Sequence, residues 1–370
     1  MNEPEKEKIK ALIFCVKSLC HRLPEPVNLM EVCGTHTVAI YRSGIKQILC
    51  HKTRLISGPG CPVCVTPNEL VDKAIWYALQ SHTIVATFGD MFKVPGSYSS
   101  LAEAKTKGGK VQLTYSPLEA LELAKRNPEE RVVFLGVGFE TTAPLVASAI
   151  LKAKEHNLSN FMVLCGHKTI PQALEKIANN PFLNLQGLIL PGHVSCIIGK
   201  NPYEFLAQDC NLRGVISGFE PGDILESICL LYKQIVEGRC EIEVQYRRAV
   251  SPEGNQEALA VLERVFTSSD SEWRGLGIIA NSGLSIREEF SNWDADLVYP
   301  AQIGKPIQHK GCICGAVITG LKEPEECSLF GDTCNPEHPV GPCMVSSEGT
   351  CGTHFLYQAR EIENESPVHP

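Results

Sequence analysis

From residue 28 to about residue 245, short apolar runs alternate with longer amphipathic stretches. The apolar runs are NLMEVC, TRLIS, TIVATFG, KVQLTY, RVVFLGVG, FMVLCG, GLILPG and GVISG. The stretches between them, such as PNELVDKAIWYALQ and SPLEALELAKRN, repeat apolar residues every three or four positions and begin with Pro or Ser. Strands that alternate with helices are typical of parallel sheets with crossover helices, so the sequence predicts an α/β fold.

An internal similarity suggests how this fold is divided. The segments GVGFETTAPLV (136–146) and VISGFEPGDIL (215–225) both read as a strand, Gly-Phe-Glu and a helix start that contains Pro. We therefore expect two similar parallel-sheet α/β domains around a cleft, at 28–130 and 131–245, although strand-to-helix turns favour glycine in general. Residues 246–370, together with a helix at 1–27, are expected to form a third, Cys-rich domain.

The seventeen cysteines are the main anomaly of the composition. The N-terminal residues lack an export signal and no apolar run reaches the roughly 20 residues that span a bilayer, so we expect a cytoplasmic protein. A formal net charge of −8 argues against a nucleic-acid surface. A reducing compartment does not support a disulfide scaffold, so some cysteines should serve metal or redox chemistry. Isolated cysteines are expected to pack in the core, namely Cys15, Cys20, Cys50, Cys165, Cys210, Cys229 and Cys240.

After residue 300 the chain is rich in Cys, Gly and Pro and has little periodicity. Metal binding could order such a segment, because it supplies free energy that apolar burial does not. The candidate ligands are Cys312, Cys327, Cys334 and Cys351, with Cys314 and Cys343 as additional thiols. Their wide spacing does not match the compact ferredoxin motif, and four thiolates suit either a [4Fe-4S] cluster or tetrahedral zinc.

Cys61 and Cys64 form a Cys-X-X-Cys motif within GPGCPVC. This spacing holds two sulfur atoms within disulfide reach, and Pro59 and Pro62 limit the freedom of the backbone around them. The motif indicates a redox-active pair. Half of a zinc site and a simple turn are the alternatives.

Cys33 and His36 follow the apolar run of LMEVCGTH. Cys33 is thereby expected at the carboxyl end of a strand, where open α/β sheets bind their ligands. A thiolate there suits a soft metal or a nucleophilic role, and His36 could bind metal or set the charge state of the thiol. A structural role for both residues is the alternative.

Further polar residues are expected at strand ends, among them Thr141 in GVGFETTAP, His167 in CGHKTIP and His193 in PGHVSCIIG. The turn GVGFET has the first two glycines of a dinucleotide-binding fingerprint, but Thr141 occupies the third glycine position. Turns of this kind still direct backbone N–H groups at the cleft, which favours a small anion.

These motifs together resemble the HypD family of hydrogenase maturation proteins. The resemblance runs from about residue 29 to 353 and is carried by LMEVCGTHT, GPGCPVC, GDMFKVPGS, YSPLEAL, GVGFETTAP, GHKTIP, PGHVSCIIG, GFEPGDIL, QYRRAVSPEGNQEA, WRGLG, SGLSI and GPCMVSSEGTC. It implies a role in building the Fe(CN)2CO unit of [NiFe] hydrogenases, in a complex with a HypC-like small chaperone and with cyanide from a HypE-like donor.

The resemblance also implies roles for individual residues. Cys33 matches the iron-binding cysteine, which would hold a transient Fe(II) with cyanide and carbonyl ligands together with a partner cysteine. Cys61 and Cys64 match a redox-active pair. The [4Fe-4S] ligands would be Cys312, Cys327, Cys334 and Cys351, with Cys314 and Cys343 close enough in sequence to leave that choice open. Some relatives carry a His where this chain has Val38.

The resulting hypothesis is an assembly scaffold with redox activity rather than a free-standing turnover enzyme. His193, His167 or Thr141 would hydrogen-bond the cyanide nitrogens in the cleft, and His36 would act beside Cys33. The alternative is a cysteine-dependent or nicotinamide-dependent metabolic enzyme with a structural zinc site, which predicts zinc in place of iron and sulfide.

Overall fold

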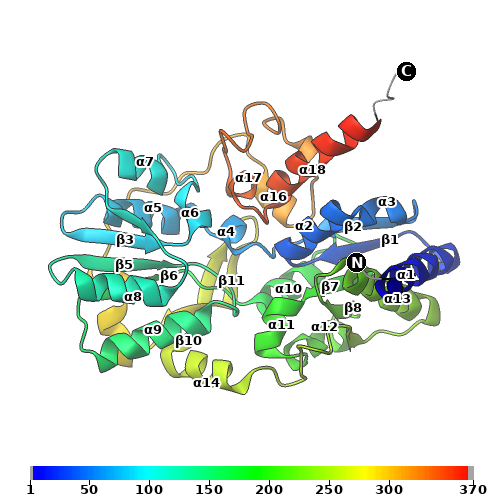
Figure 1. Ribbon diagram of the computed structural model, residues 1–370, viewed down its shortest axis with the longest axis horizontal. Helices are drawn as coiled ribbons and strands as arrows, with labels where there is room; N and C mark the ends of the chain where they lie inside the picture. The colour runs from blue at the N-terminus through cyan, green and yellow to red at the C-terminus, as the bar shows by residue number, and fades with distance from the viewer. Residues whose placement is uncertain (1–2, 366–370) are drawn as a thin grey trace.

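The computed structural model describes the backbone of residues 3–365 and the side chains of residues 3–357 (Figure 1). The strands are β1 (Val27–Glu31), β2 (Thr53–Ser57), β3 (Thr83–Thr87), β4 (Val111–Leu113), β5 (Arg131–Gly136), β6 (Phe161–Cys165), β7 (Gly187–Pro191), β8 (Arg213–Ser217), β9 (Ile242–Val244), β10 (Phe266–Trp273) and β11 (Gly277–Ile286). All eight apolar runs predicted as strands are therefore confirmed, as β1 to β8.

The helices lie between and after these strands. They are α1 (Glu3–Arg22), α2 (Gly34–Ser43), α3 (Ile45–Ile48), α4 (Pro62–Val65), α5 (Asn68–Ala78), α6 (Gly89–Phe92), α7 (Leu101–Thr106), α8 (Pro117–Arg126), α9 (Ala143–Glu155), α10 (Ile170–Ala178), α11 (Gly192–Ile198), α12 (Glu204–Gln208), α13 (Pro221–Glu237), α14 (Gln256–Val265), α15 (Ala295–Val298), α16 (Cys314–Ile318), α17 (Pro342–Val345) and α18 (Thr350–Glu365), with 3-10 turns η1 (Asn201–Tyr203), η2 (Glu288–Trp293) and η3 (Pro324–Glu326).

Within the described residues, the strands form two parallel sheets and one antiparallel hairpin. Sheet A has the strand order β2-β1-β7-β8-β9, sheet B has the order β4-β3-β5-β6, and β10 pairs with β11. In Figure 1 the two sheets lie on opposite sides of the molecule, with helices packed around each. Every residue of β7 is buried, as expected for a parallel strand that is covered on both faces. The predicted α/β class with two parallel sheets is confirmed.

The division of the chain between the sheets differs from the expected 28–130 and 131–245. Sheet A combines strands from 27–57 with strands from 187–244, because β1 pairs with both β2 and β7. Sheet B takes all of its strands from 83–165, and β3 pairs with β5 across the expected boundary at residue 130. The expected third domain includes residues 1–2 and 366–370, which lie outside the described residues.

The hairpin of β10 and β11 was not expected from the sequence. Its register runs from Phe266 opposite Ile286 to Trp273 opposite Gly277, with an irregularity between Ser269 and Ser271. Its tip reaches the region of α4, where the two sheets and the C-terminal segment meet (Figure 1). The hairpin thus brings residues 273–277 to the centre of the molecule.

The Cys-rich C-terminal segment packs onto both halves. Helix α18 packs on α2, whereas α16 and α17 contact α4. Figure 1 shows these helices above α2 and α4 in orange and red. One apolar core is continuous from Val133 of sheet B through Cys64 to Val317 and Cys343. The segment is therefore ordered partly by apolar burial, which the sequence did not indicate.

Helix α1 packs on α13 and is joined to the rest of the chain by a disulfide between Cys20 and Cys50. Both cysteines were expected to pack in the core: Cys20 is buried there and Cys50 packs against it, but the disulfide between them was not predicted. The sulfur of Cys15 contacts that of Cys229, which lies on α13. None of the described helices combines the length and the apolarity needed to cross a bilayer.

Candidate functional site

The carboxyl ends of the strands in sheet A bring the first group of predicted residues together. Cys33 follows β1, the loop of Cys61 follows β2, His193 follows β7 and Phe219 follows β8. These four strands are neighbours in the order β2-β1-β7-β8. Because parallel strands end at the same edge of a sheet, residues far apart in sequence converge there.

Cys33 lies between β1 and α2 and is 9% exposed. Burial, together with the nearby Glu348 carboxylate, raises the pKa of its thiol to about 11. The backbone N–H groups of Thr35 and His36, at the start of α2, lower the pKa and oppose this shift in part. The free thiol is therefore protonated at neutral pH, so it would have to lose its proton in order to bind a metal ion.

Gly34 allows Glu348 to approach Cys33. A Cβ atom at Gly34 would lie 2.5 Å from the backbone oxygen of Glu348, which is closer than such atoms come. The Thr35 hydroxyl donates a hydrogen bond to the Glu348 carboxylate. The C-terminal segment is thereby fixed against the residues that follow Cys33.

His36 and His193 stack on one phenylalanine ring. The ring centroid of Phe219 lies 4.5 Å from that of His36 and 3.7 Å from that of His193, and both pairs are nearly parallel. One ring face accommodates one stacked partner at these distances, so Phe219 lies between the two imidazoles. Burial lowers the pKa of His36 to about 4, and Nε2 lies 3.0 Å from the Gly218 carbonyl oxygen. His36 is therefore neutral, and the hydrogen bond to Gly218 leaves Nδ1 as the buried, unprotonated nitrogen without a partner.

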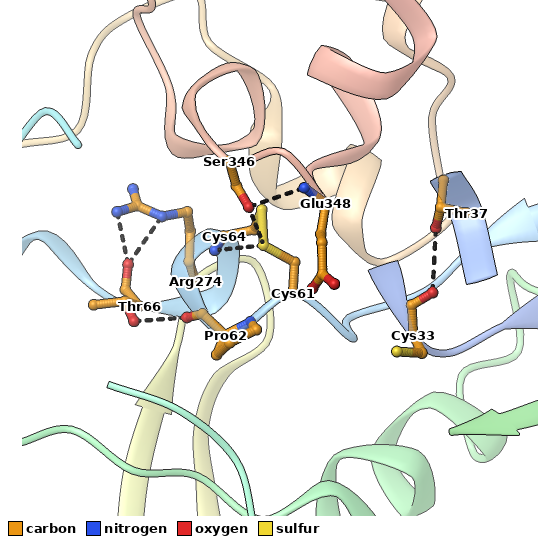
Figure 2. Close-up of a disulfide and its surroundings, with 9 residues drawn as sticks. All are labelled: Cys33, Thr37, Cys61, Pro62, Cys64, Thr66, Arg274, Ser346 and Glu348. Atoms are coloured by element: carbon orange, nitrogen blue, oxygen red, sulfur yellow. Dashed lines mark hydrogen bonds between the residues drawn. A yellow bond between two sulfur atoms is a disulfide. The ribbon is translucent and has the colours of Figure 1, made fainter. Parts of the chain in front are cut away.

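The predicted Cys-X-X-Cys pair, Cys61 and Cys64, follows a segment that lies directly beside Cys33. The backbone N–H of Gly34 donates to the Gly60 carbonyl over 3.4 Å, and a Cβ atom at Gly60 would overlap the Val32 carbonyl oxygen. The chain before Cys61 thus passes across the chain before Cys33. Figure 2 shows the Glu348 side chain between Cys33 and Cys61.

Cys61 and Cys64 form a disulfide at the start of α4, with their Cα atoms 5.2 Å apart. Both residues are buried, and the Cys64 backbone N–H donates to Cys61 Sγ over 3.2 Å. Ser346 Oγ lies 3.3 Å from Cys61 Sγ on the side of the C-terminal segment (Figure 2). The predicted disulfide reach of the motif is confirmed, whereas its redox role remains a prediction.

The C-terminal cysteines gather around a small cavity. It is lined by apolar residues that include Leu329, Phe330 and Met344, and by the cysteines Cys312, Cys314, Cys327, Cys334 and Cys351. Cys343 is fully buried behind them, with its sulfur in contact with those of Cys314 and Cys351. All four predicted ligands therefore lie together, and both additional thiols lie with them.

The chemistry of this donor set fits an iron-sulfur cluster. Contacts with the sulfurs of Cys314 and Cys343 lower the pKa of Cys351 to about 5, and contacts with neighbouring cysteine sulfurs lower the pKa of Cys314 as well, which favours thiolates in this cluster. Among the described residues, no three or more His, Cys, Asp or Glu side chains converge on a single ion position. A [4Fe-4S] cluster makes a different demand, because each of its four thiolates binds a different iron.

Two predicted residues follow strands of sheet B. His167 follows β6 and is 1% exposed, with Nδ1 3.6 Å from Cys165 Sγ and its ring near Phe266. Thr141 lies in the turn between β5 and α9. The described contacts link His36 to Cys33 and, through Phe219, His193 to His36, whereas no described contact joins His167 or Thr141 to Cys33.

Sequence reasoning missed two residues of this site, Glu348 and Phe219. Glu348 contacts residues more than 300 positions earlier in the chain, and no local pattern encodes such a pairing. Phe219 lies in the GFEPGD motif, whose position at a strand end was the available signal.

Comparison with known proteins agrees with the resemblance seen in the motifs. The HypD family model, described as "Hydrogenase formation hypA family", matches residues 7–358. The chain is 46% identical over 338 residues to a protein of Rhodobacter capsulatus named hydrogenase maturation factor HypD, and this match covers 90% of each of the two chains. It is 40% identical over 346 residues to the protein of that name from Escherichia coli (strain K12), covering 93% of each chain. It is 43% identical to that from Cupriavidus necator, covering 89% of each chain. The chain therefore belongs to the HypD family.

Proposed function

We propose that this chain is a hydrogenase maturation factor that holds iron while the Fe(CN)2CO unit of a [NiFe] hydrogenase is assembled. The observation that carries this proposal is the convergence of three kinds of cysteine site around α2 and α4. Cys33 and the Cys61–Cys64 disulfide belong to crossing segments, and the cavity of C-terminal cysteines lies beyond α4. A single metal-binding cysteine beside a redox pair suits a site where iron is both bound and reduced.

Iron is the cargo in this proposal and Cys33 is its ligand on this chain. A thiolate is a soft ligand, which suits Fe(II) that carries strong-field cyanide ligands. The Glu348 carboxylate lies beside the thiol and can accept the proton that Cys33 loses on binding. A cysteine of a HypC-like chaperone would supply a second thiolate. A groove lined by Thr35, Val38 and Phe219 opens next to this position.

His193 is the residue best placed to hydrogen-bond a cyanide nitrogen. It is exposed and stacks on Phe219. Partial burial lowers its pKa, and the Glu348 carboxylate opposes this effect. His36 stacks on the same ring and is buried, so it would affect His193 only through Phe219. His167 and Thr141 follow strands of sheet B and have no described contact with His193, Phe219 or Cys33, so His193 is preferred for this role.

The disulfide would act as a two-electron relay. Reduction of the Cys61–Cys64 disulfide consumes two electrons and two protons and yields two thiols, and oxidation of the dithiol returns them for ligand attachment or iron reduction. A [4Fe-4S] cluster held by Cys312, Cys327, Cys334 and Cys351 would supply electrons one at a time. Ser346 and Glu348 connect the disulfide to the C-terminal segment that carries those cysteines.

The test is an infrared spectrum of the chain isolated without oxygen together with its HypC-like partner and a HypE-like cyanide donor. We expect cyanide and carbonyl stretching bands in the wild-type complex. They should be lost in Cys33→Ala and retained in the control Cys210→Ala, whose cysteine lies outside the site. Bands that persist in Cys33→Ala would refute Cys33 as the iron ligand. A Cys64→Ser variant that assembles the complete ligand set would contradict the redox role of the disulfide.

A further inference from the structure

The tip of the β10–β11 hairpin lies between the disulfide segment and the C-terminal cysteines. The Arg274 backbone N–H donates to the Val65 carbonyl, the last residue of α4, over 2.9 Å. On the other side, a Cβ atom at Gly275 would lie 2.5 Å from the backbone oxygen of Gly315, the residue after Cys314. Gly275 also has a positive φ of 81°, which favours glycine. The backbone of residues 274–275 therefore lies between α4 and the residues that follow Cys314, and contacts both.

The Arg274 side chain is a buried cation at this position. It is 7% exposed, and its Nε and Nη2 donate to the Thr66 carbonyl oxygen over 3.1 and 2.7 Å. Nη2 also donates to Asn68 Oδ1 over 2.7 Å. Figure 2 shows both hydrogen bonds from the guanidinium to Thr66, which lies two residues after Cys64. All of these acceptors are neutral, and within the described residues Arg274 forms no ion pair with a carboxylate.

The C-terminal cysteines, as thiolate ligands of the proposed cluster, are the negative groups that this charge would balance. Arg274 and Asn68 line one small cavity together with Cys312, Cys314 and Gly341. A buried cation without a carboxylate partner is costly, so an anionic neighbour is the arrangement that repays its desolvation.

We propose that Arg274 is a positioning residue that holds the disulfide segment beside the C-terminal cysteines and makes an iron-sulfur cluster there easier to reduce. The inference rests on the cluster of the proposed function. Reduction adds negative charge, and a fixed cation in a water-poor site stabilises the more negative state. Removing one such charge should lower the equilibrium constant for reduction by about tenfold, which corresponds to about 59 mV for a one-electron couple.

The experiment uses the full chain isolated without oxygen, with iron and sulfide content measured first. The midpoint potential of the cluster is then determined by a redox titration followed by electron paramagnetic resonance. Arg274→Met removes the charge at similar length. Asn68→Asp leaves Arg274 in place and neutralises it with a carboxylate of the same shape. The matched control is Arg287→Gln at the other end of β11, where an exposed arginine also donates to a backbone carbonyl.

We expect the potential to fall in Arg274→Met and in Asn68→Asp, and to stay at the wild-type value in Arg287→Gln. Arg274→Lys keeps the charge and should restore most of the potential. If Arg274→Met does not fold, the Asn68→Asp and Arg274→Lys variants still decide the question. Unchanged potentials in variants that hold a complete cluster would refute this inference alone. A wild-type chain that takes up no iron and sulfide would refute the cluster itself, and with it this inference.

Discussion

Glu140 offers a quantitative test of the electrostatics of sheet B. Its carboxyl group lies in the turn after β5 and is 3% exposed. Oε1 accepts a hydrogen bond from the Ile170 backbone N–H over 2.9 Å, whereas Oε2 is buried without a partner. Burial raises the pKa of this carboxyl group from 4.5 to about 7. The folded chain therefore favours the protonated form.

The sign and size of the effect follow from linkage. Between about pH 4.5 and pH 7 the folded chain binds more protons at Glu140 than the unfolded chain does, so this residue lowers the free energy of unfolding as the pH rises. The two pKa values differ by about 2.5, and one pKa unit corresponds to 1.36 kcal/mol, which gives about 3 kcal/mol at pH 8. Glu140→Gln removes the ionisable group and thereby this cost.

The assay is denaturant unfolding of Glu140→Gln and wild-type protein at about pH 4.5, 6, 7 and 8. We expect the free energy of unfolding of the variant, relative to wild type, to increase by about 3 kcal/mol from pH 4.5 to pH 8. The amide adds a buried donor, which shifts all values by a constant and leaves the slope unchanged. Glu257→Gln on the exposed face of α14 serves as the control. A difference between variant and wild type that is independent of pH would refute the reasoning.

Two further substitutions test the packing around the site. Gly34→Ala should cost about 1–3 kcal/mol in the free energy of unfolding and increase labelling of Cys33 by thiol reagents, because the new Cβ pushes Glu348 away. Gly89→Ala, also at the first residue of a helix but with nothing within 4 Å, should be neutral, and equal effects of both would contradict this account. Cys20→Ala should lower the free energy of unfolding of the oxidised protein by about 3–4 kcal/mol, since the disulfide spans 30 residues. That difference should shrink in reducing buffer, and a difference of the same size there would argue for packing alone.

The strands could be predicted from the sequence, but their partners could not. Each of β1 to β8 is a short run rich in β-branched and other apolar residues, which is a local signal. The pairing of Leu29 with Gly187 joins segments 158 residues apart, and both β2 and β7 satisfy the same apolar preference. The hairpin was missed because β10 reads FTSSDSEW, where most residues between the two aromatic ends are polar and only partly buried or exposed.

Cysteine motifs located the site because thiol chemistry depends on a few residue types at short spacing. Cys33, Cys61 and Cys64 lie together because β1 and β2 are neighbours, which could be expected from adjacent strands. The contributions of Glu348 and Arg274 depend on tertiary contacts with residues more than 200 positions away. Such contacts leave no periodic trace in the sequence, so only the structure reveals them.

The interleaved strand order has a consequence for synthesis on the ribosome. Strands β1 and β2 emerge first, but the strand that joins them to the rest of sheet A begins at Gly187, 130 residues after Ser57. At about 5–20 residues per second, this gap lasts roughly 7–26 seconds. Sheet B, whose strands lie between 83 and 165, can close during that time.

Cys33 is therefore made early and enclosed late. Strand β1 cannot pair with β7 until β7 has been synthesised, and Glu348, which lies beside Cys33, is synthesised more than 300 residues later. The cysteine site is complete only when nearly the whole chain has left the ribosome. The order of the strands thus delays the completed cysteine site until the C-terminal segment that carries Glu348 is also in place.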